Sequence, residues 1–431
     1  MTSIARQLAV QSPILGEYIR DSVQQHRDIA NQSLADQWHC LITKSLTRVQ
    51  GVLYPPFLVV VIDAIDECDN DDDVMIILRL LAETQPHACI QVRFFLTSRP
   101  EVPVRRVFNK LPESRRQNFV LHEIIEETTH DLSVFFRDKL AEIAENHYMG
   151  ADWPGYTTIP MLVDLASGLF IWAATACRFI DDGKQFAGAR LSTILQSKGT
   201  GNKPQDHLDN IYLTVFIHSI SASYTEEEKS TAYSLLRYVL GSIVVLCSEL
   251  PANSVAALLG LKGQDVQGTL KDLHSILAIP NKAHHSLRLH HPSLRDFLLD
   301  NQRCTNPDLY VDEKEAHRKV LITCIRLMST TLKKDICGLG APGTLVQDIK
   351  THQVERCLPP ELQYACLYWG QHLSKSGNHA YDNDFIHQFL KTHLLHWLEA
   401  LSLMGRVSEG IHTINLLVSR SLVCMIAWRM A

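Results

Sequence analysis

An unbroken apolar run, FLVVVI, occupies residues 57–62 and stops at Asp63. Its β-branched residues favour an extended strand, and a run without polar alternation is typical of a parallel strand that is covered on both faces. A second run, IQVRFFL at 90–96, indicates another strand, and a helix is expected between the two over residues 74–83. Strand, helix and strand in this order predict a right-handed parallel sheet.

Polar side chains follow each strand where it ends. Asp63 comes directly after the first run with Asp66 and Glu67 behind it, and Arg99 follows the second run. The carboxyl ends of parallel strands form the ligand-binding edge of an α/β sheet. There Asp63 is predicted to hold Mg²⁺ through water, and Asp66 or Glu67 to polarise an attacking water. Arg99 is predicted to approach a γ-phosphate. The alternative is that both strands simply end in polar loops, one with a solvated arginine.

A phosphate loop of the form G-x-x-x-x-G-K-[S/T] is not found in the 431 residues. The backbone amides of such a loop cradle phosphates, and its lysine neutralises them. Ahead of the first predicted strand the glycines are Gly16 and Gly51, and neither is near a Gly-Lys-Ser/Thr sequence. The TKS tripeptide at 43–45 has no glycine turn before it and lies in a helical pattern. We therefore expect Met1 to fall shortly after this loop, so that the first strand of the sheet is missing as well.

Helical periodicity dominates after residue 126. The apolar spacing predicts helices over Asp131–Ala144 and Ile159–Phe179, and the FVLH segment at 119–122 is a candidate for a further strand. Residues 198–204, KGTGNKP, are rich in glycine, lysine and proline and are the best candidate for a linker.

Two helices joined by a tight turn, the second over Asp265–Ile276, precede a short hairpin at 277–291, which is the order of a winged helix. Helices are expected again beyond Asn306. The predicted fold class is α/β: a partial doubly wound parallel sheet, then a helical domain, a winged-helix domain and a second helical domain. The expected domains are residues 1–125, 126–200, 205–305 and 306–431.

The composition limits the classes of function. A net charge of -6 disfavours a nucleic-acid surface as the main function. The 11 cysteines show no CxxC pairs, which favours reduced thiols in the cytoplasm. The N-terminal segment is amphipathic and does not resemble a signal peptide, and the apolar stretch Tyr238–Cys247 is too short to span a bilayer. A cytoplasmic protein without a membrane partner is expected.

Larger motifs carry a resemblance to a known family. VVVIDAIDEC and FFLTSRP resemble the Walker B and sensor-1 motifs of NACHT proteins, most closely the fungal members of the signal-transducing (STAND) class of P-loop NTPases. The segments SIARQLA, GLFIWAATACRFI, HPSLRDFLLD and YACLYWGQHL are similar to other parts of those proteins. Together the similar segments cover most of residues 1–410.

The resemblance implies a further site residue. In NACHT proteins a winged-helix histidine contacts the phosphates of bound ADP and holds the module closed, and HPSLRDFL places that role on His291. Leu294 stands where the family usually has an aromatic residue. The alternative is a structural histidine, because the chain contains 21 histidines and His290 is adjacent.

The resemblance also implies ATP/ADP or GTP/GDP with Mg²⁺ as cofactors in the intact family, NTP hydrolysis, and self-association or pairing with full-length NACHT relatives. The expected function is a fragment of a STAND switch with a degenerate nucleotide site, from a fungal NLR-like non-self recognition or incompatibility regulator. One alternative is a nucleotide-independent adaptor or decoy that pairs with full-length relatives. A winged-helix DNA-binding regulator is the other, although the helix at 265–276 carries Asp265, Lys271 and Asp272 rather than a basic face.

Overall fold

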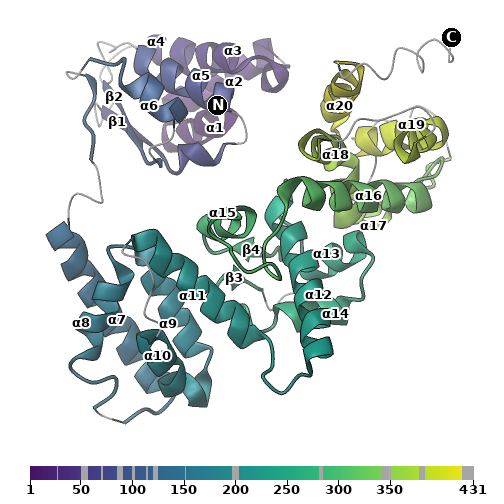
Figure 1. The fold of residues 1–431 in the computed structure, drawn as a ribbon. Helices are drawn as coiled ribbons and strands as arrows, with labels where there is room; N and C mark the ends of the chain where they lie inside the picture. The colour runs from purple at the N-terminus through teal and green to yellow at the C-terminus, as the bar shows by residue number, and fades with distance from the viewer. Residues whose placement is uncertain are drawn as a thin grey trace. The chain divides into compact units, whose positions relative to one another are not determined.

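The computed structural model divides into two compact units, Met1–Val120 and Leu121–Ala431 (Figure 1). The residues that it describes are 1–26, 28–49, 57–68, 71–84, 91–99, 102–112, 115–119, 125–150, 152–196, 203–280, 285–340, 349, 351–377 and 384–419. The divisions at residues 200 and 305 expected within the second unit stay predictions.

The first unit begins with helices α1 (Thr2–Gln11) and α2 (Pro13–Gln25). A longer helical segment follows as α3 (Leu34–Trp38), a π-helical turn and α4 (Lys44–Thr47). Ser33 caps α3, since its hydroxyl accepts the Asp36 N–H at 3.2 Å. The π-helical turn contains Cys40, whose carbonyl accepts the hydroxyl of Ser22 at 2.6 Å. This bond ties α2 to the turn.

Strands β1 (Phe57–Ile62) and β2 (Gln91–Leu96) form a parallel pair in which Phe57 lies opposite Gln91 and Ile62 opposite Leu96. Helix α5 (Asp71–Glu83) connects them and α6 (Val102–Phe108) follows. The predicted strand–helix–strand unit is therefore present. Its strands begin and end within a residue of the predicted bounds, although Ile90 lies outside the described residues.

The prediction that these strands are covered on both faces is wrong for the described residues. Residues of one face, among them Leu58 and Phe94, pack against the helical core. There the ring centroids of Trp38 and Phe94 are 6.1 Å apart. On the opposite face Val59, Val61 and Phe95 are 52%, 64% and 53% exposed. Alternate side chains of a strand point to opposite faces, so a run that is apolar throughout is covered on both faces only where elements lie on both. The candidate strand at 119–122 falls mostly outside the described residues.

The second unit opens with a helical subdomain. Its helices are α7 (Ile125–Asn146), α8 (Thr158–Ala166), α9 (Phe170–Asp181), α10 (Ala187–Gln196) and α11 (Pro204–Ser219). The single helix predicted over 159–179 is wrong, because Ser167 (φ 47°) and Gly168 (φ 83°) adopt left-handed conformations between α8 and α9. The apolar spacing continues through this break because both helices contribute to the same core. The linker expected at 198–204 lies mostly outside the described residues.

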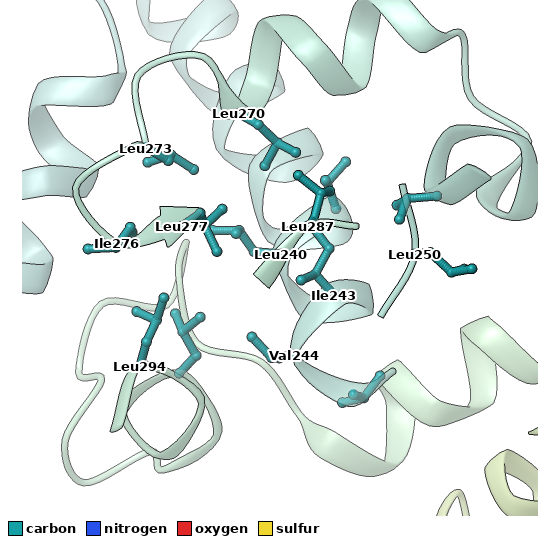
Figure 2. Packing of buried hydrophobic residues seen from close by; sticks show 14 of the residues in the cluster. Leu240, Ile243, Val244, Leu250, Leu270, Leu273, Ile276, Leu277, Leu287 and Leu294 are labelled. Carbon is teal, nitrogen blue, oxygen red and sulfur yellow. The ribbon is translucent and has the colours of Figure 1, made fainter. Parts of the chain in front are cut away.

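The middle of the second unit contains helices, a short hairpin and another helix. These elements are α12 (Glu226–Val245), α13 (Ala252–Leu259), α14 (Gly263–Leu270), antiparallel β3 (Leu277–Ala278) and β4 (Arg288–Leu289), and α15 (Ser293–Leu299). Helix α14 ends at Leu270, so the prediction of a helix to Ile276 is wrong. Turns closed by Leu273 N–H to the Leu270 carbonyl and Ile276 N–H to the Leu273 carbonyl lead to β3. They place Leu273 and Ile276 in the same core as Leu277, as Figure 2 shows.

The remaining helices are α16 (Glu313–Thr331), α17 (Thr351–Cys357), α18 (Pro360–Lys375), α19 (Phe385–Leu403) and α20 (Val407–Ser419). At their centre lies Trp369, which is fully buried. It packs edge-to-face with Trp397 and Phe389, with ring centroids 5.5 and 6.0 Å apart. Helical segments predicted beyond Asn306 are confirmed as α16, α18 and α19. Among the described residues, no helix has the length and hydropathy needed to cross a membrane.

Candidate functional site

The carboxyl ends of β1 and β2 meet at Asp63 and Thr97, which directly follow the paired residues Ile62 and Leu96. The backbone pairing continues past the strands: the Thr97 N–H donates to the Ile62 carbonyl at 3.0 Å, and the Ile65 N–H donates to the Thr97 carbonyl at 3.1 Å. These bonds fix the loop after β1 to the loop after β2. The edge of the sheet therefore holds the polar residues predicted from the sequence in one place.

Thr97 connects the two loops through its side chain. Its hydroxyl donates to Asp63 Oδ1 and accepts the Ala64 N–H at 2.8 Å. Asp63 itself is exposed, and its carboxylate is thus oriented by a neighbour without being buried. Thr97 was not among the site residues predicted from the sequence. Its signal is the register, because a hydroxyl that directly follows β2 must lie opposite the carboxylate that directly follows β1.

Ala64 turns the chain sharply after Asp63. It adopts a left-handed conformation with φ 49° and ψ 53°, which costs a residue with a β-carbon about 1–2 kcal/mol. The turn carries Ile65, 3% exposed, into a small core with Val74, Leu78 and Val107. Burial of Ile65 offsets the backbone strain. The short 3-10 helix Ile65–Glu67 that follows positions the remaining carboxylates.

Asp66 and Arg99 bind one another. The Arg99 N–H donates to Asp66 Oδ1 at 3.0 Å, and the guanidinium Nε lies 3.6 Å from Asp66 Oδ2. The Asp66 side chain is 6% exposed, whereas that of Arg99 is 38% exposed. From the sequence, separate roles are predicted for these residues, Asp66 toward water and Arg99 toward phosphate. In the structure they form a single unit that joins the loop after β1 to the loop after β2.

The donor chemistry at this edge fits Mg²⁺. Asp63 supplies an exposed, oriented carboxylate, and Glu67 supplies another exposed carboxylate close along the chain. Mg²⁺ usually keeps several waters and takes one or two carboxylates together with substrate phosphates. Among the described residues, no group of three or more His, Cys, Asp or Glu side chains is arranged to hold a metal by itself. A metal here would therefore depend on water and phosphate oxygens for its remaining ligands.

His291 belongs to the second unit, in the turn between β4 and α15. Its Nδ1 accepts the Ser293 N–H at 3.1 Å and lies 2.7 Å from the Ser293 hydroxyl oxygen. The adjacent His290 is engaged differently, with Nε2 3.0 Å from the His274 carbonyl oxygen. Burial, and then the nearby Arg178 cation, lower the pKa of His290. Leu294, which replaces the aromatic residue usual in the family, is 1% exposed and packs in the core.

Comparison with known proteins adds two matches. A family model described as Nephrocystin 3, N-terminal, matches residues 1–99, the stretch that contains both strands and ends at Arg99. Vegetative incompatibility protein HET-E-1 of Podospora anserina is 25% identical over 383 residues, which is 83% of this chain. The chain spans about a quarter of that relative's own length, 26%. These matches confirm the resemblance that the motifs indicated: the chain is similar, over most of its length, to a fungal vegetative incompatibility protein.

Proposed function

We propose that this chain is part of a nucleotide-dependent signalling switch of the NACHT type, within a fungal incompatibility or non-self recognition regulator. The observation that carries the proposal is the joined end of β1 and β2, where Thr97 orients Asp63 and Asp66 holds Arg99. The name of the relative assigns that protein to vegetative incompatibility, which favours signalling over metabolism. On this reading the second unit supplies a winged helix, built from α13, α14 and the β3–β4 hairpin, and flanking helical domains.

The residues take distinct parts in the proposed switch. Asp63 holds Mg²⁺ through water, because it is exposed and its carboxylate is oriented. Of the two candidates for polarising an attacking water, Glu67 is exposed, whereas Asp66 is nearly buried and already binds Arg99. Asp66 therefore sets the position of Arg99, which approaches the terminal phosphate. His291 contacts the phosphates of the diphosphate-bound state.

We further propose that nucleotide binding by these 431 residues is weak. A phosphate loop supplies backbone amides and a lysine to the phosphates, and no G-x-x-x-x-G-K-[S/T] sequence is present among them. What remains is Asp63 for the metal and Glu67 for the attacking water, with Arg99 and His291 as the side chains proposed to contact phosphate. Such a site has the polar groups that respond to a nucleotide without those that hold it tightly, so residual or no hydrolysis is expected.

Binding of fluorescent ATP, ADP, GTP and GDP analogues to the purified chain, with and without Mg²⁺, tests this function. We expect Mg²⁺-dependent binding weaker than about 10 μM that falls roughly tenfold further in Asp63→Asn, since a 1.4 kcal/mol loss is tenfold. Asp71→Asn, an exposed carboxylate at the start of α5, is the matched control and should bind like the unchanged chain. Tight binding that Asp63→Asn abolishes would show a complete site and refute the degenerate one. Binding that neither Asp63→Asn nor Arg99→Ala changes would place the nucleotide elsewhere and refute the switch.

A second candidate is a nucleotide-independent adaptor that pairs with full-length relatives. The observation that favours it is the Asp66–Arg99 pair, in which the residues satisfy one another without a ligand. Co-purification with a full-length relative after enzymatic removal of all nucleotide tests this reading. Capture that persists without nucleotide and survives Asp63→Asn supports the adaptor, whereas capture that requires Mg-ATP contradicts it.

DNA binding receives no support from the second helix of the proposed winged helix. The charged residue of α14, with sequence GQDVQGTL, is Asp265. Just beyond the helix, Lys271 lies 3.8 Å from the Asp272 carboxylate. A recognition helix needs cations for the phosphates and donors for base edges, and this one offers a carboxylate instead.

A further inference from the structure

A chain of hydroxyl groups ends on the imidazole of His291. The Tyr212 phenol oxygen lies 2.7 Å from the Ser293 hydroxyl oxygen, which lies 2.7 Å from His291 Nδ1. Tyr212 is 1% exposed and Ser293 is 8% exposed, so water does not compete freely for these bonds. The chain connects α11, which carries Tyr212, to the start of α15, which carries Ser293.

The direction of each hydrogen bond follows from one backbone group. The Ser293 N–H points at His291 Nδ1 at 3.1 Å, and a backbone N–H can only donate, so Nδ1 carries no proton. The Ser293 hydroxyl, facing the same lone pair, must donate as well. Its oxygen is then the acceptor for Tyr212, whose pKa burial raises, so that the phenol keeps its proton at neutral pH. A neutral imidazole with an unprotonated Nδ1 carries its proton on Nε2.

Helix α11 packs against the α15 segment on both sides of the hydrogen bonds that join Tyr212, Ser293 and His291. The Tyr212 ring packs 5.6 Å from the Phe297 ring. One turn earlier on α11, Asp209 forms a bidentate ion pair with Arg303. Its Oδ1 lies 2.6 Å from Arg303 Nη2, and its Oδ2 lies 3.2 Å from Arg303 Nε. Both side chains of the pair are mostly buried, 12% and 14% exposed. The position of the Tyr212 hydroxyl is therefore set by the packing of α11 on α15.

We propose that Tyr212 and Ser293 are positioning residues that hold His291 neutral with its proton on Nε2, as a hydrogen-bond donor for an anionic oxygen. The ligand class is the terminal phosphate of a nucleoside diphosphate, and this part rests on the proposed function. The proton arrangement itself does not, because it follows from the bonds among Tyr212, Ser293 and His291. A change in the packing of α11 on α15 would then be transmitted to the imidazole through the Tyr212 hydroxyl.

Long-range ¹H–¹⁵N NMR of the full chain, with ¹⁵N-labelled histidine, measures this proton arrangement directly. His291→Gln assigns the resonances of His291. We expect an unprotonated, pyridine-type Nδ1 and a protonated, pyrrole-type Nε2 at pH 7.5. Ser293→Ala should move the ¹⁵N chemical shifts of both ring nitrogens toward the averaged values of an imidazole that exchanges between its two tautomers. Tyr212→Phe should move these chemical shifts in the same direction by a smaller amount. Tyr238→Phe, which removes another half-buried phenol bonded to the Leu259 carbonyl, is the matched control and should leave them unchanged.

A protonated Nδ1 in the unchanged chain, or unmoved resonances in both Ser293→Ala and Tyr212→Phe, would overturn the proposal. Nucleotide binding provides a separate arm. If ADP binds, Tyr212→Phe should weaken it several-fold, while Tyr238→Phe should not. If ADP does not bind but the Nε2–H form is observed and responds to the variants, the positioning stands and the proposed ligand is wrong.

Discussion

The end of the β1–β2 sheet and the α16–α18 interface hold polar side chains in opposite ways. At the sheet end, Asp63 is exposed and the Arg99 side chain is 38% exposed, beside a small core. Between α16 and α18, His317 and His372 are 1% and 0% exposed, with their Nδ1 atoms 2.8 Å apart. His372 Nε2 lies 2.6 Å from the buried Tyr364 hydroxyl. The first group faces solvent, and the second is enclosed by the largest core of the chain.

The difference shows that a cluster of polar side chains can serve either ligand binding or helix packing, depending on its exposure. Loops that follow strands expose carboxylates to ligands and are held by a few bonds, so small changes there alter binding more than stability. A buried imidazole pair cannot reach a ligand, and the hydrogen bond between its two Nδ1 atoms helps to specify how α16 and α18 pack.

The largest effect is expected from Trp369→Ala in the second unit. Removing a fully buried tryptophan that packs on Trp397 and Phe389 should cost about 3–5 kcal/mol in the free energy of unfolding. Hydrogen exchange read by mass spectrometry should show faster exchange in α16, α18 and α19. Trp38→Ala, which removes the tryptophan on Phe94 in the first unit, is the counterpart and should loosen β1 and β2 instead. Equal acceleration in both units by either variant would contradict the division.

Acidification should destabilise the α16–α18 interface. Burial, and then the nearby Lys375 and Arg295 cations, lower the pKa of His317 to about 4. Burial, and then His317 and Lys375, lower that of His372 to about 3. An unfolded histidine titrates near pH 6.5, so this stability is fully present above that value and is lost as the pH falls toward 4.

Thermal unfolding between pH 7.5 and 4.5 checks this loss. The Tm assigned to the second unit should fall with pH. In His372→Leu that slope should be smaller, even though Tm at neutral pH is lower. An unchanged slope would mean that other groups control the acid sensitivity.

A moderate effect is expected from Asp66→Ala at the sheet end. The variant leaves the Arg99 N–H without its acceptor and removes the charge beside the guanidinium, which should cost about 1–3 kcal/mol. Faster hydrogen exchange over residues 57–67 and 91–99 is the measurement. Glu67→Ala, one residue further and exposed, should change stability by less than about 0.5 kcal/mol. Equal losses in the two variants would show that the pair does not hold the loops together.

The smallest effect is expected from Ala64→Gly. Glycine removes the left-handed strain of about 1–2 kcal/mol but loses about 0.5–1 kcal/mol to chain entropy, so the net change should be a gain of up to about 1.5 kcal/mol. Urea denaturation measures it. Ala82→Gly, in the last turn of α5 where the backbone is right-handed, is the control and should lose up to about 1 kcal/mol. A loss of similar size in Ala64→Gly would show that the left-handed turn is unstrained.

Apolar spacing predicted the helices correctly where one uninterrupted apolar pattern corresponds to one helix, as at α16, α18 and α19. It failed where two elements share a core. Residues 159–179 keep helical spacing across the Ser167–Gly168 break, and residues 271–276 keep it through turns, because both segments point the same side chains inward. Polar residues at the strand ends were found because parallel strands place their carboxyl ends together. Thr97 was not selected, since a hydroxyl carries no signal until the register sets it opposite Asp63.

By itself, the sequence determined that two apolar strands are followed by carboxylates and by an arginine. The strand–helix–strand order makes the two strands parallel, so these polar residues lie at the same edge of the sheet. The sequence also carried the motifs that relate the chain to the fungal incompatibility proteins. Only the tertiary structure decided that Asp66 binds Arg99, that one sheet face is exposed, and that Tyr212, Ser293 and His291 are joined by hydrogen bonds. The physical reason is distance along the chain. Tyr212 and Ser293 are 81 residues apart, and only the packing of α11 on α15 brings their hydroxyls within hydrogen-bonding reach.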